Sequence, residues 1–422
     1  MSDTPTLGAL VRVFGRIGLL SFGGPAAQIA LMHRELVESR GWLTEDQFLR
    51  GLGFCMLLPG PEAMQLAIYA GWRQRGIAGG LIGGGLFVLP GAMVIFALAL
   101  AYGAVIGTPV AQALFLGVKA AVVAIVIEAI LRVARRALKT RTHWAIAVLA
   151  FVALFALHLP FPLVIGLAAL WGYLSTAPEA TAPDAVKLRL TPAMSVLAIG
   201  GLIWIAPLVL AWGLGQELLL ELGLFFSKLA IVTFGGAYAV LAYMTQEVVQ
   251  AYGWLTTGEM MDGLGLAETT PGPLILVTQF VGVVAGAKQG GWPLGLAGGV
   301  IVLWVTFVPC FIWIFAGAPL IDWLAGRARL TGALAAITAA VVGVIASLSL
   351  WFAAHVLFAR VGEVAFGPVR LLAPDPASLD PLALALTVLA AWALVVRHWP
   401  LPLVLALAAG LALLVRLALP LL

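Results

Sequence analysis

Two short motifs that interrupt apolar runs are the residues best suited to chemistry. Phe22-Gly23-Gly24-Pro25 lies inside the run 7–32, and Pro59-Gly60-Pro61 lies inside the run 46–70. Glycine lowers helix stability by about 1 kcal/mol and an interior proline by about 3 kcal/mol, whereas proline is favourable at the first position of a helix. We therefore expect one helix to end near Ser21 and the next to start at Pro25, with a second break of this kind at Pro61.

Such breaks suit an anion. A helix start inside a bilayer presents backbone N–H groups that protein, water or a ligand must satisfy, and it carries about half a positive charge. The alternative is that these glycines and prolines only allow close packing or kinks. Because both motifs recur in the second half of the chain, the anion-binding interpretation is favoured.

The recurrence is an internal repeat. At an offset of 212 residues, 14–61 and 226–273 share 19 identities in 48 ungapped positions, including Phe-Gly-Gly, Gly-Trp-Leu-Thr and Pro-Gly-Pro. Later stretches match at offsets of 219 and 240, the last pairing His158 with His398. The sequence predicts an N-terminal repeat at 1–174, a linker with one extra span at 175–217 and a C-terminal repeat at 218–422.

Two cations stand at matching positions before the breaks. Arg16 aligns with Lys228, each six residues before its Phe-Gly-Gly. A charged residue inside a span suggests an ion pathway, although both side chains could instead reach a nearby interface. Together with backbone donors and hydroxyls they would suit a dianion. The predicted substrate-binding set is Arg16, Ser21, Gly23, Gly24, Pro25, Gly60, Pro61, Lys228, Thr233, Gly235, Gly236, Thr270 and Gly272.

Three acidic residues lie within apolar runs and are predicted to couple transport to protons: Glu62, Glu128 and Glu268. The alternative for each is an ion pair with Arg or Lys on a neighbouring helix. Lys119 also lies deep in an apolar run, but its counterpart is Thr338, so symmetry does not support a role for it.

Composition decides what kind of fold holds these residues. Apolar types make up 63% of the 422 residues and charged types 10%, against about 45–50% and 25% in soluble domains. This predicts an all-α polytopic membrane protein with about 10–13 spans, each of about 20 residues. The apolar segments are 7–32, 46–70, 77–105, 110–131, 143–174, 194–213, 218–244, 258–285, 292–316, 331–358, 379–397 and 400–420.

The basic residues predict that the two repeats have opposite orientation. Residues 33–50 carry three arginines and 245–262 carry no Lys or Arg; 132–141 carry five basic residues and the matching 351–360 carry Arg360 alone. Loops rich in Lys and Arg stay on the cytoplasmic side. Inverted-topology repeats with broken helices are typical of secondary transporters, whose substrate site lies at the midplane.

The motifs also resemble a known family. Phe22-Gly23-Gly24-Pro25, Gly41-Trp42-Leu43 and the run from Pro59 to Ala67 are similar to the chromate ion transporter family in its long, duplicated form. The resemblance covers essentially the whole chain and implies a bacterial inner-membrane carrier that exports chromate. The second copy departs from the pattern at Ala237 and Leu274, where the family has Pro and Glu, which suggests that Glu62 acts in one copy only.

The predicted function is therefore secondary active export of chromate, driven by a proton gradient or by anion exchange. One alternative is a carrier of sulfate or another oxyanion, and a less favoured one is a membrane-embedded enzyme. The scattered histidines and two cysteines show no metal-ligand spacing, so no catalytic set, metal or cofactor is predicted. The expected partners are an oxyanion and the lipid bilayer but no nucleic acid, with a homodimer left open.

Overall fold

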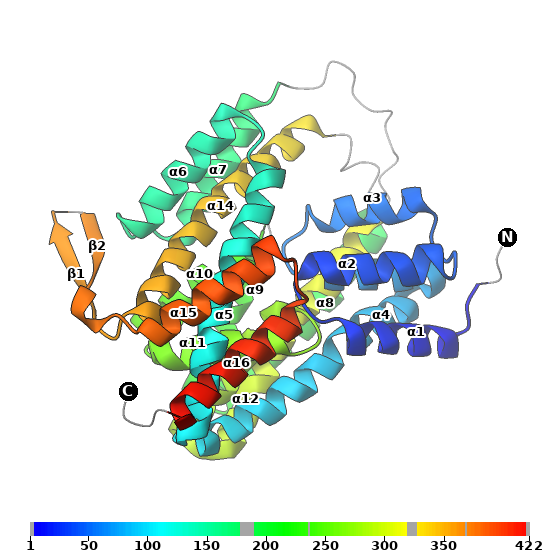
Figure 1. Cartoon of the computed structure of the whole chain (residues 1–422). Coiled ribbons are helices and arrows are strands. Elements are labelled where there is room, and N and C mark those ends of the chain that lie inside the picture. Colours follow the sequence, from blue (N-terminus) through cyan, green and yellow to red (C-terminus); the bar gives the residue numbers. More distant parts are fainter. Residues whose placement is uncertain (1–3, 178–189, 235–236, 319–326, 368, 419–422) are drawn as a thin grey trace. The chain divides into compact units, whose positions relative to one another are not determined.

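The chain is almost entirely helical (Figure 1). A computed structural model describes residues 4–177, 190–234, 237–318, 327–367 and 369–418. It divides into two compact units: unit 1 comprises Met1–Leu100, Ala177–Val240 and Thr270–Thr331, and unit 2 comprises Ala101–Thr176, Leu241–Thr269 and Gly332–Leu422. Each unit draws segments from both halves of the chain, so the units cut across the two predicted repeats, which stay a prediction.

Unit 1 is built on long helices that pack through small residues. Helix α12 packs against α8 and α9, and indole N–H groups join α8 to α12: Trp204 donates to the Val305 carbonyl at 3.0 Å and Trp304 to that of Ile203 at 2.9 Å. Gly200 of α8 also lies against Ile312 of α12, where a Cβ would meet Ile312 Cγ1 at 2.7 Å, so a small residue allows this close approach. The helices are α1 (Leu7–Leu20), α2 (Pro25–His33), α3 (Glu45–Cys55), α4 (Glu62–Val105, in this unit up to Leu100), α8 (Leu190–Gly213), α9 (Glu217–Val232) and α12 (Val277–Gly317). Helix α10 (Ala237–Gln246) begins in unit 1 and continues into unit 2 from Leu241.

Helices α4 and α12 are each bent back on themselves. Their helical geometry fails at Arg75 and Gly76 (φ +56°) in α4 and at Gly290 and Gly291 (φ +70°) in α12. Beyond the bend, Gly79 of α4 lies against Gly71, where a Cβ would meet the opposing carbonyl at 2.1 Å. The first arm of α4 is thus about 20 Å long at 1.5 Å per residue, too short to cross a hydrocarbon core of about 30 Å by itself.

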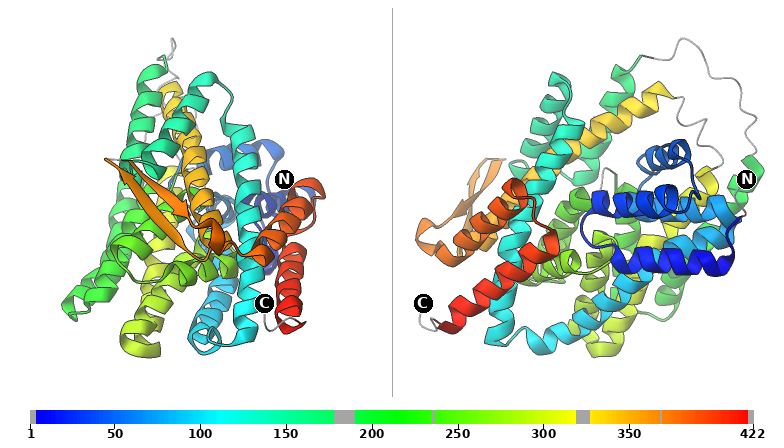
Figure 2. Two further views of the ribbon diagram at one scale, coloured as in Figure 1. Left: turned by 60° about the vertical axis from the view of Figure 1, so that its left-hand side comes forward. Right: turned by 45° about the vertical axis from the view of Figure 1, so that its right-hand side comes forward.

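Unit 2 gathers around α5. This helix (Pro109–Ala137) packs against α11 (Thr257–Thr269), α15 (Pro381–Ala391) and α16 (Leu401–Ala418). Helices α6 (Arg141–Phe155) and α7 (Phe161–Ser175) divide the apolar segment 143–174, and α6 lies against α14 (Ala328–Leu357). After α14, β1 (Val361–Phe366) and β2 (Val369–Pro374) form an antiparallel ribbon (Figure 2) that the sequence did not predict.

Local structure repeats along with the sequence. Each copy has a π-helical turn, η1 (Arg34–Glu38) and η2 (Glu247–Ala251), followed by a glycine at positive φ. Both then start a helix with a capping box, Thr44 with Gln47 and Thr256 with Glu259. His158 and His398 share a left-handed conformation at φ of about +50°, as expected for residues aligned at the offset of 240.

Six helices in the described part are long and apolar enough to cross a membrane: Glu62–Val105, Pro109–Ala137, Ala193–Gly213, Leu274–Gly317, Ala328–Leu357 and Leu401–Ala418. The all-α polytopic fold is therefore confirmed. Shorter apolar helices, which include α6, α7 and the segment that begins with α15, accompany them. Because several elements are broken or bent, the number of full crossings stays a prediction.

Candidate anion site at the paired helix breaks

The helix breaks form where the motifs predict them. Helix α1 ends at Leu20 and α2 begins at Pro25, with Gly23 between them at φ +85°. The Pro-Gly-Pro motifs separate α3 from α4 and α11 from the segment that leads into α12, with Gly60 at φ +124° and Gly272 at φ +91°. Residues other than glycine rarely adopt these φ angles. Gly235 and Gly236 of the predicted set lie outside the described residues.

The breaks of the two copies meet in unit 1 in crossed pairs. The Gly60 amide donates to the Thr233 carbonyl at 2.8 Å, and the Gly272 amide donates to the Ser21 carbonyl at 2.8 Å. Ser21 aligns with Thr233 and Gly60 aligns with Gly272, so the two bonds are equivalent under the repeat. Each Pro-Gly-Pro turn therefore satisfies a carbonyl at the end of the other copy's broken helix, as buried backbone groups require.

The hydroxyls beside the breaks donate hydrogen bonds to backbone carbonyls of their own helices. Ser21 Oγ donates to the Ile17 carbonyl and Thr233 Oγ1 to the Leu229 carbonyl, both at 2.6 Å. Both side chains are buried. Each hydroxyl therefore stabilises the last turn of a broken helix. Because its hydrogen is already donated, it can act toward a further group only as a hydrogen-bond acceptor.

Gln28 ties one crossed pair together, and the sequence interpretation missed it. Its buried Nε2 lies 2.8 Å from the Gly272 carbonyl, 3.0 Å from that of Gly23 and 3.4 Å from that of Ser21. The aligned residue in the second copy is Val240, so the tie is present once. A polar residue one turn after Pro25 in an apolar helix was the available signal.

Gln65 is a second buried amide, and it lies beside the first Pro-Gly-Pro. Its side chain is fully buried, and its Nε2 donates to the Pro59 carbonyl at 2.7 Å. Its Oε1 has no hydrogen-bond partner among the described residues. The space around it is tight, because a Cβ on Gly60 would lie 2.8 Å from Gln65 Nε2 and 3.0 Å from Cys310 Sγ.

The two predicted cations lie on exposed faces of their helices. The Arg16 side chain is 61% exposed, and its Nη1 lies 3.7 Å from Glu35 Oε1; Glu35 also pairs with Arg40. Lys228 is exposed on α9. Both predicted cations are thus exposed in this structure, whereas Thr270 is buried next to the second Pro-Gly-Pro.

The three predicted proton-coupling residues are distributed over both units. Glu62 stands in the first turn of α4 in unit 1, where a carboxylate interacts favourably with the helix dipole. Glu128 in unit 2 pairs with Arg132, one turn further along α5. Glu268, also in unit 2, is buried near the end of α11.

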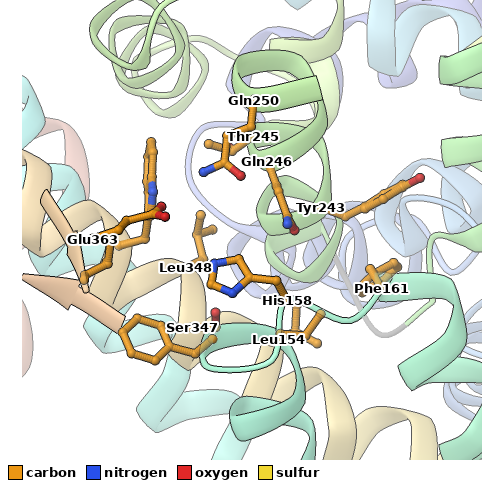
Figure 3. A pocket seen from close by; sticks show the side chains of 14 residues that line it. Leu154, His158, Phe161, Tyr243, Thr245, Gln246, Gln250, Ser347, Leu348 and Glu363 are labelled. Atoms are coloured by element: carbon orange, nitrogen blue, oxygen red, sulfur yellow. The ribbon is translucent and has the colours of Figure 1, made fainter. Parts of the chain in front are cut away.

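Unit 2 holds a separate polar cavity between α6–α7, α14 and the α10–η2 segment (Figure 3). Thr245 Oγ1 and His158 Nδ1 are buried in its wall with no hydrogen-bond partner among the described residues. Gln246 and Gln250 add amides, and Glu363 adds a carboxylate. Because that carboxylate would repel a dianion, the cavity suits water or an uncharged ligand better than an oxyanion.

The described residues contain no cluster of three or more His, Cys, Asp or Glu that could hold a metal ion. In that part of the chain, six apolar helices of membrane-crossing length define the class: a polytopic helical membrane protein. Comparison then gives the family. The model for the family described as "Chromate transporter" matches residues 8–173 and 220–414, and the chain belongs to this family.

Several relatives carry the same description. The chain is 34% identical to a chromate transport protein of Pseudomonas aeruginosa over 347 residues, which cover 80% of this chain and 79% of that protein. It is 30% identical to a chromate transport protein of Cupriavidus metallidurans over 82% of both chains. It is 29% identical to a probable chromate transport protein of Synechococcus elongatus over 81% of this chain and 83% of that one. No solved structure matches.

Proposed function

We propose that this protein is a secondary carrier that exports chromate across the bacterial inner membrane. Family membership and relatives named as chromate transport proteins support chromate as the substrate. The observation that carries the proposal is the pairing of the four helix breaks in unit 1, two by two, through the Gly60–Thr233 and Gly272–Ser21 hydrogen bonds.

The anion binds, in this proposal, at the first turns of the helices that follow the breaks. The first amides of a helix have no partner within it, and the N-terminus attracts negative charge. The amides of Gly60 and Gly272 donate to carbonyls in this structure, and the Ala27 amide donates to the Gly24 carbonyl at 3.0 Å. The donors proposed for the anion are therefore the amide of Ala26 in α2 and the first-turn amides of α4. Arg16 and Lys228, one to two turns before the breaks, attract the dianion through their field.

The membrane potential favours export of a dianion. Moving one charge across 100 mV is worth about 2.3 kcal/mol, so a dianion that leaves an inside-negative cell gains about 4.6 kcal/mol per 100 mV. Proton coupling through Glu62, Glu128 or Glu268, or exchange for another anion, would add to this drive.

Sulfate is the alternative substrate, because it has the same charge and tetrahedral shape and backbone amides recognise both features. Chromate counterflow into proteoliposomes, measured with labelled chromate, tests the proposal. We expect Arg16→Gln combined with Lys228→Gln to lower counterflow at least tenfold, while Arg50→Gln, which removes an exposed cation paired with Asp46, leaves it unchanged.

Undiminished counterflow in the Arg16/Lys228 double variant would show that neither cation contributes to the proposed site. Inhibition by sulfate at far lower concentration than unlabelled chromate would instead make sulfate the preferred substrate and leave the site in place.

A further inference from the structure

Unit 2 contains a buried ion pair that the sequence interpretation missed. Lys119 Nζ lies 2.8 Å from Asp262 Oδ1, and the Tyr102 hydroxyl donates to Asp262 Oδ2 at 2.7 Å. Asp262 was not among the predicted proton-coupling residues, and Lys119 lacked support from symmetry. The pair joins positions far apart in the chain, which no short motif connects.

The surrounding helices hold the pair tightly. Lys119 lies ten residues into α5, and Asp262 lies near the middle of α11. One turn after Asp262, Gly265 meets Val118, the neighbour of Lys119; a Cβ on Gly265 would lie 2.3 Å from Val118 Cγ1. Glycine at this position therefore lets α11 approach α5 closely enough to form the pair.

The two charges differ in their access to the surface. The Asp262 side chain is 3% exposed, whereas that of Lys119 is 22% exposed. The carboxylate is thus enclosed by protein, whereas the ammonium is partly exposed. A proton added to Asp262 would leave the Lys119 charge without its partner at a less enclosed position.

Few other charges face Asp262. Glu259 lies one turn earlier on its own helix, where it caps Thr256, and Glu268 is buried further along α11. On α16, which also packs against α5, Arg416 lies 3.7 Å from Asp380. Within the part of the chain that the structure describes, Lys119 is the cation bonded to Asp262.

We propose that Asp262 binds and releases the proton that couples transport, with Lys119 as its charge partner; this rests on the proposed carrier function. A proton from one aqueous phase adds to an Asp262 carboxylate oxygen and gives a neutral carboxyl. Lys119 keeps its own proton and loses its counter-charge, so the attraction that holds its ammonium against Asp262 is weakened. Release of the proton to the other phase restores the pair, so one proton is taken up and one released per cycle.

Tyr102 can follow this exchange. Its hydroxyl donates to the carboxylate and, after rotation about its C–O bond, can accept from the neutral carboxyl. The residues aligned with Asp262 and Lys119 are Arg50 and Thr338, which could not form the same pair. The chain therefore repeats its anion-binding breaks but has one proton site of this kind.

Two measurements on the same proteoliposomes test the inference. Counterflow reports anion binding and movement without a driving gradient, and accumulation under an imposed pH gradient reports coupling. For Asp262→Asn we expect counterflow within threefold of the wild type, pH-driven accumulation lowered at least tenfold and a flat pH profile. Asp262→Glu should restore part of the accumulation, and Asp46→Asn, the same change on an exposed face of α3, should behave as wild type.

Because Asp262→Asn leaves a half-buried lysine without its partner, that variant could misfold. The double variant Lys119→Ala/Asp262→Ala removes both charges and should show the same split between counterflow and accumulation. Wild-type accumulation in either variant, loss of counterflow in both, or a wild type that ignores the pH gradient would overturn the inference. A wild type without counterflow would instead remove the carrier proposal, and this inference with it.

Discussion

At the scale of single residues, the amide of Gln28 joins backbone groups from both copies. It donates toward three carbonyls at the break, one of them from the other copy's Pro-Gly-Pro. A buried carbonyl that loses its donor costs about 1–3 kcal/mol. We therefore expect Gln28→Leu to lower the unfolding free energy by about that amount, measured by thermal unfolding in detergent, and to reduce transport. Gln112→Leu, on the exposed face of α5, should change neither.

Equal melting temperatures for Gln28→Leu and the wild type would show that the crossed break does not depend on this side chain.

His33 provides a pH-sensitive link outside the membrane-length helices. Its Nε2 lies 2.7 Å from Glu45 Oε2 and its Nδ1 3.1 Å from Glu38 Oε1. The hydrogen bond to Glu45 is the largest cause that raises the pKa of His33 above its ordinary value of 6.5, and partial burial opposes it. The stabilisation is thus fully present below pH 6.5 and is lost as pH rises through the raised pKa.

The expected effect is below about 1 kcal/mol, because the pair is solvent-screened. Thermal unfolding should show the wild type more stable than His33→Gln at pH 6, with the difference closing at alkaline pH. A difference that grows with pH would mean that the neutral imidazole is the stabilising form.

At the scale of elements, the Pro-Gly-Pro turns depend on glycine. Gly60 and Gly272 have φ of +124° and +91°, and a non-glycine residue in such a conformation costs about 1–3 kcal/mol. We expect Gly60→Ala and Gly272→Ala each to lower stability by this amount and counterflow at least tenfold. Gly53→Ala in α3 is the matched control, because its Cβ would meet nothing within 4 Å and alanine favours a helix by about 0.5–1 kcal/mol.

If both turn variants transported as well as Gly53→Ala, the geometry of the breaks would be irrelevant to the anion.

The elements also show what the sequence could predict. Glycine and proline act locally, so the breaks near Pro25, Pro61 and the second Pro-Gly-Pro, the capping box at Thr44 and the split of 143–174 were predictable. The partners of Gln28 and the Lys119–Asp262 pair were not, because they depend on which helices pack together. The ribbon of β1 and β2 was missed because its strands are largely exposed and carry no alternating apolar pattern.

At the scale of the whole molecule, the repeat and the compact units organise the chain differently. The family match falls into two regions, 8–173 and 220–414, within the two predicted repeats. Each compact unit, however, combines segments of both halves. Crossed bonds such as Gly60–Thr233 require this exchange, because each copy supplies one partner. A single copy would leave both broken helix ends without their backbone partners.

The predicted inversion of the repeats can be tested with two matched positions. Ser39 and Ala251 align at the offset of 212, follow or end the two π-helical turns and are both exposed. The basic residues of 33–50 favour the cytoplasmic side, and 245–262 lack them. A membrane-impermeant maleimide should therefore label Ala251→Cys in intact cells and Ser39→Cys only in everted vesicles. The native Cys55 and Cys310 are buried, so the unsubstituted chain serves as the background control.

Labelling of both positions from the same side would mean that the copies are parallel. The paired breaks would then need a different symmetry to present one anion to both sides of the membrane.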